Sequence, residues 1–172
     1  MPKKVAVAPK KNGKKETIAL GADPMGAVLK NSVKKHLLDE GYKVIDYGTD
    51  KPENFVTYFG ISSKTAKAVQ KGLADKGIVF CGTGMGVSIT ANKFKGIYCG
   101  LIESEFTANE CKIINNCNML AMGSRVISEA RANMAVDNWL NRKFNEGTPK
   151  PYIKLVADAL KEIAKIEDAN FK

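Results

Sequence analysis

The sequence predicts an α/β protein built on a doubly wound, five-stranded parallel sheet with flanking helices. Short apolar runs alternate along the chain with longer segments whose apolar residues recur at three- and four-residue spacing. The run at 77–81 is apolar throughout, as central strands of parallel sheets usually are, because helices cover both faces. Segment 149–172 shows the same helical spacing, which predicts an amphipathic C-terminal helix.

The first predicted strand covers 17–22, an apolar run that ends in small residues. Pro24 suits the first turn of a helix, which is expected to run to about Glu40 with Gly41 closing it. A second strand follows at 42–47, and a second helix at 57–72 ends at Gly72. Residues 4–8 could add an edge strand beside 17–22.

The second half of the chain repeats this alternation. The apolar strand at 77–81 leads through a glycine-rich loop into a helix at 86–94. Strands are then predicted at 97–102 and 118–122, and helices at 104–114 and 128–143. The chain therefore divides into a basic N-terminal extension (1–16), one α/β domain (17–148) and a helix (149–172) that packs on the domain or on a second subunit.

The formal net charge of +9 raises the question of nucleic-acid binding. Lysines crowd the first fifteen residues, but elsewhere they alternate with acidic residues and no aromatic stacking platform accompanies them. We therefore expect no nucleic-acid partner, whereas a small anionic substrate would benefit from the positive field. No apolar run is long enough to span a membrane, and the basic N-terminus lacks a signal peptide's apolar region, so a cytoplasmic protein is expected.

Metal binding is not expected, because the four cysteines form no C-x-x-C pair and have no histidine companions. In a parallel sheet of this type, ligands bind at the carboxyl ends of the strands. Three segments are then expected to meet: 21–23 after the first strand, 81–88 after the third and 123–125 after the fifth.

The stretch F-C-G-T-G-M-G-V-S at 80–88 is the most informative segment. Its alternating glycines let the backbone approach a ligand closely and let successive amides point one way, so they can form an anion-binding nest at a helix N-terminus. No Gly-Lys-Ser/Thr follows, so this is not a Walker loop, and its spacing is not that of a dinucleotide fingerprint. Glycine spacing alone does not identify the ligand.

Cys81 at the start of this loop suggests its chemistry. A thiol beside amide dipoles ionises more readily than a free cysteine, although a small residue ending a buried strand is the alternative interpretation. The sequence has one histidine, His36, inside the first helix, so Cys-His and Ser-His-Asp schemes are not expected. A cysteine that acts as a base next to a carbonyl needs only an anion hole for the enediolate, and the loop can supply it.

Four segments together closely resemble one family: C-G-T-G-M-G-V-S-I-T-A-N-K-F-K-G-I (81–97), G-A-D (21–23), V-I-D-Y-G-T (44–49) and M-G-S-R-V (122–126). They are similar to the ribose-5-phosphate isomerase B and galactose-6-phosphate isomerase family of aldose–ketose isomerases, over about residues 17–144. The resemblance implies a sugar-phosphate substrate, no metal or organic cofactor, and a homodimer or tetramer with active sites at the subunit interface. A paralogous partner subunit is also possible within this family.

The resemblance also implies roles for residues at matching positions. Cys81 would move the proton between C1 and C2 through a cis-enediol, Thr83 would assist ring opening or proton exchange, and Asp23 would bind sugar hydroxyls near the ring oxygen. The backbone amides of Gly82, Gly84, Met85 and Gly86 would hold the enediolate. Ser88 would close the loop on the ligand, Asn115 would bind a substrate oxygen from the neighbouring loop, and Arg125 would help hold the phosphate.

The chain departs from the family where histidines and arginines are usual. Pro24 and Ile114 stand where the family commonly has histidines, and 146–154 replaces a C-terminal arginine clamp, leaving Lys150 or Lys154 as possible phosphate contacts. The leading hypothesis is a sugar-phosphate isomerase for a pentose, hexose or tetrose phosphate. An open-chain substrate, such as a tetrose phosphate, would not need the missing ring-opening histidine. The alternative is a non-catalytic or partner-dependent subunit, or a sugar-phosphate-binding module.

Overall fold

The computed structural model describes residues 15–171, and it confirms the predicted fold class. Five parallel strands form one sheet in the order β2-β1-β3-β5-β4. The strands are β1 (Thr17–Ala22), β2 (Lys43–Asp46), β3 (Lys76–Cys81), β4 (Cys99–Ile102) and β5 (Met119–Gly123). The possible strand at 4–8 lies outside the described residues. Because β5 lies between β3 and β4, the last two strands are exchanged relative to their order in the sequence.

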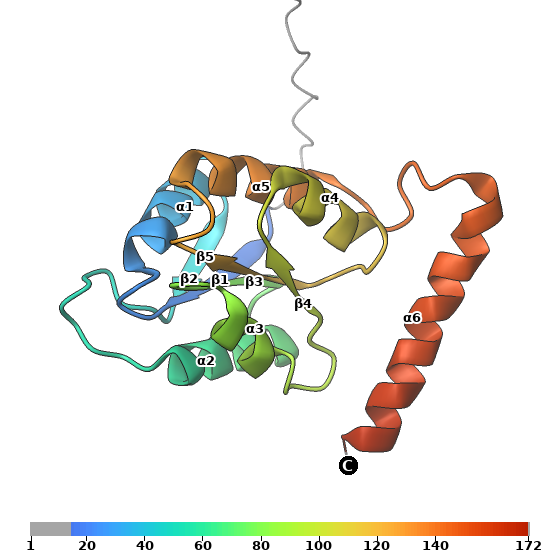
Figure 1. Ribbon diagram of the computed structural model, residues 1–172, viewed down its shortest axis with the longest axis horizontal. Coiled ribbons are helices and arrows are strands. Elements are labelled where there is room, and N and C mark those ends of the chain that lie inside the picture. Colours follow the sequence, from blue (N-terminus) through green and yellow to red (C-terminus); the bar gives the residue numbers. More distant parts are fainter. Residues whose placement is uncertain (1–14, 172) are drawn as a thin grey trace, which may run out of the picture.

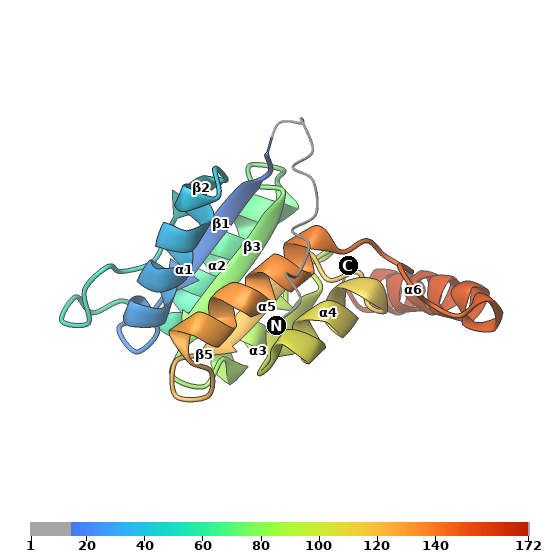
Figure 2. The same cartoon turned by 90° about the horizontal axis from the view of Figure 1, so that it is seen from above.

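Helices cover both faces of the sheet, as Figures 1 and 2 show. The helices are α1 (Ala27–Asp39), α2 (Tyr58–Gln70), α3 (Met85–Ala91), α4 (Glu105–Ile113), α5 (Glu129–Asn141) and α6 (Lys150–Asn170). α1, α4 and α5 lie on one face, and α2 and α3 lie on the other. This is the arrangement that the alternation of strand and helix predicts.

The two-residue period of β3 divides its side chains between two cores. Ile78 and Phe80 pack into the cluster beneath α1, α4 and α5. Val79 and Cys81 pack into the cluster beneath α2 and α3. Both sets are almost fully buried, which explains why the whole strand is apolar. Cys81 therefore enters the loop from the α2/α3 side of the sheet.

Two element boundaries differ from the sequence prediction for local reasons. α1 begins at Ala27 and not at Pro24, because the Asp23 carboxylate accepts a hydrogen bond from Gly26 N at 3.0 Å and holds a turn there. α3 ends at Ala91, and the following Asn92 turns its amide to the edge strand β4, where it bonds both N and O of Cys99 at 2.9 Å. The Asn92 side chain thus satisfies the backbone N–H and C=O of Cys99, which an edge strand would otherwise leave unpaired.

The predicted C-terminal helix is present as α6, which stands beside the sheet beyond β4 in both views (Figures 1 and 2). None of its residues is buried. Glu167 connects it to the body: its Oε1 accepts Gly96 N at 2.7 Å and its Oε2 accepts the Tyr98 hydroxyl at 3.2 Å. Within residues 15–171, no helix is both long and apolar enough to cross a membrane.

Candidate active site

The loops after β1, β3 and β5 meet at the carboxyl edge of the sheet, as the sequence predicts. Asp23 N donates to Phe80 O at 3.3 Å, which connects the first loop to the third strand. Ser124 N donates to Cys81 O at 2.9 Å, and Arg125 N donates to Gly82 O at 3.0 Å. Backbone hydrogen bonds therefore hold the three loops in one fixed arrangement.

Cys81 is the last residue of β3 and only 6% exposed. Its sulfur accepts a hydrogen bond from the backbone N–H of Gly84 at 3.1 Å. A backbone donor is therefore aimed at the sulfur at the point where β3 enters the glycine loop. The geometry thus supports the interpretation of Cys81 as a base, beside its role as a buried strand residue.

Two glycines make this close approach of the loops possible. Gly84 has φ of +80°, and a Cβ there would lie 2.6 Å from Leu101 Cδ1 and 3.0 Å from the carbonyl carbon of Met122. A Cβ on Gly123 would lie 2.5 Å from the carbonyl carbon of Thr83. Any side chain at either position would push the glycine loop away from β5.

The loop leads directly into α3, so its amides are available to a ligand. Ser88 N makes the first intrahelical bond, to Gly84 O at 3.1 Å. The three amides before it, at residues 85–87, have no acceptor within the helix. Met85 N makes only a long contact of 3.4 Å with Thr83 Oγ1, and Thr83 is exposed. This cluster of N–H groups next to Cys81 can hold a developing oxyanion.

Asp23 and Arg125 flank the loop. One carboxylate oxygen of Asp23 caps the turn at Gly26, and the residue remains partly exposed. Arg125 is exposed, and its Cδ and Nε lie 3.9 Å from where a Gly82 Cβ would be. Ser88 is placed differently, because its hydroxyl contacts Cys99 O on β4 at 3.4 Å and so points away from the glycine loop.

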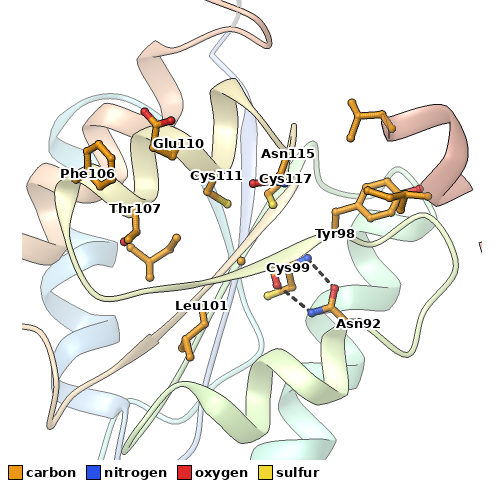
Figure 3. A pocket seen from close by; sticks show the side chains of 14 residues that line it. Asn92, Tyr98, Cys99, Leu101, Phe106, Thr107, Glu110, Cys111, Asn115 and Cys117 are labelled. Carbon is orange, nitrogen blue, oxygen red and sulfur yellow. Dashed lines mark hydrogen bonds between the residues drawn. The ribbon is translucent and has the colours of Figure 1, made fainter. Parts of the chain in front are cut away.

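The other predicted binding residues lie elsewhere in the same chain. α4 runs back along the sheet from the carboxyl end of β4, so Asn115 lies near the amino end of that strand, opposite Cys81. Asn115 lines a pocket of about 450 Å³ along β4 and α4 (Figure 3), and Cys81 is not among the residues that line it. Lys150 and Lys154 lie in the first turns of α6, where Lys154 pairs with Asp158. Within one chain, Asn115, Lys150 and Lys154 therefore do not lie at the glycine loop.

Two residues that the sequence analysis did not assign also shape the site. The Tyr58 ring lies 2.8 Å from where a Cβ of Gly86 would be, so it borders the glycine loop. The Ser124 hydroxyl donates to Met25 O at 2.7 Å and joins the loops after β5 and β1. Tyr58 directly follows Thr57, whose hydroxyl caps α2. The sequence predicted the start of this helix at residue 57, but it did not predict that Tyr58 lies near Gly86.

A buried charge cluster supports the loop between β2 and α2. Lys30 is fully buried, with Nζ 2.6 Å from Asp46 Oδ2 and 2.5 Å from Asp50 Oδ1. The hydrogen bond from Lys30 holds the pKa of Asp50 below its ordinary value. Within the same loop, Thr49 N donates to Ala22 O at 3.1 Å, directly before Asp23. The cluster therefore fixes the loop that packs against the first site segment.

Among residues 15–171, no three His, Cys, Asp or Glu side chains are arranged to hold a metal ion.

Comparison with known proteins identifies similar chains. Residues 18–156 match the model of the Ribose/Galactose Isomerase family. A 4-deoxy-4-sulfo-D-erythrose isomerase from Clostridium sp. (strain MSTE9) is 32% identical over 155 residues, which cover 90% of this chain and 98% of the relative. A D-erythrulose-4-phosphate isomerase from Pectobacterium atrosepticum is 32% identical over 140 residues, covering 81% of this chain and 92% of that one.

The fold is also similar to that of a solved structure. Ribose-5-phosphate isomerase B from Clostridium thermocellum superposes with a TM-score of 0.81 at 37% sequence identity. The match covers 89% of this chain and 98% of the solved one.

Proposed function

This chain belongs to the ribose/galactose isomerase family, and from that premise we propose that it is an aldose–ketose isomerase that uses Cys81 as its proton-transfer base. Its similarity to several sugar-phosphate isomerases supports the reaction class. The observation that carries the assignment of Cys81 is the 3.1 Å hydrogen bond from Gly84 N to its sulfur, beside the open amides of α3.

The reaction requires a proton to move between two neighbouring carbons. The Cys81 thiolate removes the proton from C2 of the aldose, and electrons move onto the carbonyl oxygen to form a cis-enediolate. The amides of residues 82–86 hold that oxyanion, which is where charge develops in the transition state. Thr83 relays protons between the oxygens, and Cys81 returns its proton to C1 to give the ketose. Asp23 binds the sugar hydroxyls from the neighbouring loop.

We further propose a substrate of four carbons with an anionic group on C4. Such a sugar has no free C4 hydroxyl to close a five-membered ring, so it remains open-chain. A ring-opening histidine is then dispensable, which fits Pro24 and Ile114 at the positions where the resemblance leads us to expect histidines. Two of the relatives described above are named for four-carbon substrates. Arg125, exposed beside Gly82, is the proposed ligand of the anionic group.

We propose that the site is completed by a second copy of the chain. Within one chain, Cys81 lies at the carboxyl ends of the strands and Asn115 lies near their amino ends. Asn115 can therefore bind substrate only in a neighbouring subunit. Exposed apolar side chains beside the glycine loop support an interface there. They are Tyr58, Phe59, Met85 and Ile89, each more than 40% exposed. Lys150 and Lys154 would approach the phosphate in the same way, from the partner.

The test replaces Cys81 with alanine and measures isomerisation of four-, five- and six-carbon aldose phosphates. We expect kcat to fall on the order of 10²–10⁴-fold, because one base is lost. The matched control is Cys99→Ala, since Cys99 is a similarly buried thiol on the same side of the sheet, and it should retain activity. Undiminished turnover by Cys81→Ala would refute the mechanism. A five-carbon preference in the wild-type protein would refute the substrate proposal alone.

The partner-dependent alternative makes a different prediction. If the site needs a paralogous subunit, the purified chain is inactive at every chain length, and co-expression with a paralogue restores turnover. If two copies suffice, mixing inactive Cys81→Ala with inactive Asn115→Ala subunits regenerates up to one intact site per mixed dimer. Recovery of activity on mixing therefore supports the shared site, and no recovery contradicts it.

A further inference from the structure

Two cysteines outside the proposed active site approach each other at the connection between α4 and β5. Cys111 lies in the last turns of α4, and Cys117 precedes β5. Asn116 reverses the chain between them with φ of +48°, and Cys117 N donates to Cys111 O at 3.1 Å. The backbones of the two cysteines are therefore in direct contact, although five residues separate them.

The Cys111 sulfur lies over Gly100 on β4. A Cβ on Gly100 would lie 2.4 Å from Cys111 Sγ, so the missing side chain makes room for that sulfur. Figure 3 shows both side chains on the wall of the pocket along β4. Cys99 lines the same pocket but belongs to the core on the other face of the sheet.

The surroundings of the two thiols differ, so their roles differ. The hydrogen bond from Cys111 lowers the pKa of Cys117, and the positive charge of Lys112 acts in the same direction. The same hydrogen bond, together with burial, raises the pKa of Cys111. The thiolate is therefore favoured on Cys117, with Cys111 holding the shared proton. A thiolate next to a protonated thiol is the arrangement of an attacking and a resolving cysteine.

We propose that Cys111 and Cys117 are a redox pair, a modification site at which a peroxide forms a disulfide. The Cys117 thiolate attacks one peroxide oxygen, the O–O bond breaks, and hydroxide leaves, so the sulfur becomes a sulfenic acid and the peroxide is reduced. The Cys111 sulfur then attacks the Cys117 sulfur. An S–S bond forms, the S–O bond breaks, and water leaves with the thiol proton. An added dithiol reverses the modification by exchange.

The disulfide closes a small loop over residues 111–117, and that loop contains Asn115. If Asn115 serves the active site as proposed above, oxidation changes how it is presented to the substrate. The proposed disulfide does not depend on that role of Asn115, because disulfide formation is measured on the two thiols directly. The sole tryptophan reports on it, since Trp139 Nε1 donates to Cys117 O at 3.1 Å.

The experiment treats the full-length protein with hydrogen peroxide, blocks free thiols with an alkylating agent and maps tryptic peptides without reduction. Trypsin cleaves after Lys112, so the bond joins peptide 96–112 to peptide 113–125. We expect this cross-linked pair, a matching change in Trp139 fluorescence, and loss of both on adding dithiothreitol. Because peptide 96–112 also contains Cys99, the variants Cys111→Ser and Cys99→Ser assign the bond. The first should lose the cross-link and the second should keep it.

Two results would overturn the proposal. One is the absence of the cross-linked peptides at a peroxide concentration that already oxidises Cys81 in the same sample. The other is a cross-link that survives Cys111→Ser and disappears in Cys99→Ser. Isomerase activity is recorded in parallel but does not decide the question, because oxidation of Cys81 would abolish activity by itself.

Discussion

Substituting alanine for Gly84 should disrupt the protein far more than the same change at a glycine of equal backbone conformation. Gly84 has φ of +80°, and a new Cβ would lie 2.6 Å from Leu101 Cδ1 and 3.0 Å from the backbone of Met122. Gly96 has φ of +78°, but a Cβ there would meet no atom within 4 Å. The two variants therefore share the cost of a left-handed backbone and differ only in the steric overlap.

The magnitudes follow from these two terms. A left-handed conformation costs an L-residue about 1–2 kcal/mol, so Gly96→Ala should lose about that much free energy of unfolding. Overpacking of a filled core adds about 1–3 kcal/mol, so Gly84→Ala should lose roughly 2–5 kcal/mol. Moving the loop also removes the donor that Gly84 N offers to the Cys81 sulfur. A lost hydrogen bond to a charged group corresponds to about 10- to 100-fold in rate.

Urea unfolding followed by circular dichroism measures the stability of both variants, and the isomerase assay measures their kcat. We expect Gly96→Ala to retain the wild-type kcat, because its position is remote from the loop. Equal destabilisation of the two variants would show that the glycine loop can move without cost. Tight contact with β4 and β5 would then not be what holds the loop in place.

Two further predictions concern charged groups. Lys30→Met should reduce the free energy of unfolding by on the order of 3 kcal/mol, because it removes the buried partner of Asp46. In the same urea titration, Lys34→Met should cost less than about 1 kcal/mol, because Lys34 contacts the same carboxylate from a more exposed position. The hydrogen bonds from Arg131 lower the pKa of Glu105 from 4.5 to about 2, so the stability that this pair contributes is present above pH 4.5 and is lost as the pH falls toward 2. Arg131→Gln should therefore lower the melting temperature at pH 6 more than at pH 2.5, and an equal decrease at both would contradict the assignment.

The local elements and the meeting of the site loops were largely predictable from the sequence. Strand and helix patterns have periods that are properties of each segment, so the ranges at 17–22 and 77–81 agree with β1 and β3 to within one residue. The meeting of the loops after β1, β3 and β5 followed from the rule that parallel strands present their carboxyl ends together. Boundaries failed where distant side chains intervene, as where Asn92 bonds Cys99 beyond the end of α3.

The sequence by itself determined the fold class, the glycine loop behind Cys81 and the kind of reaction that these groups support, because all three depend on residue types within short segments. Only the tertiary structure decided that β5 lies between β3 and β4, that Asn115 lies at the opposite end of the strands from Cys81, and that the backbones of Cys111 and Cys117 are in contact. These features depend on which helix faces pack together across the sheet. Packing of that kind is settled by the long-range fit of buried surfaces, which no local pattern encodes.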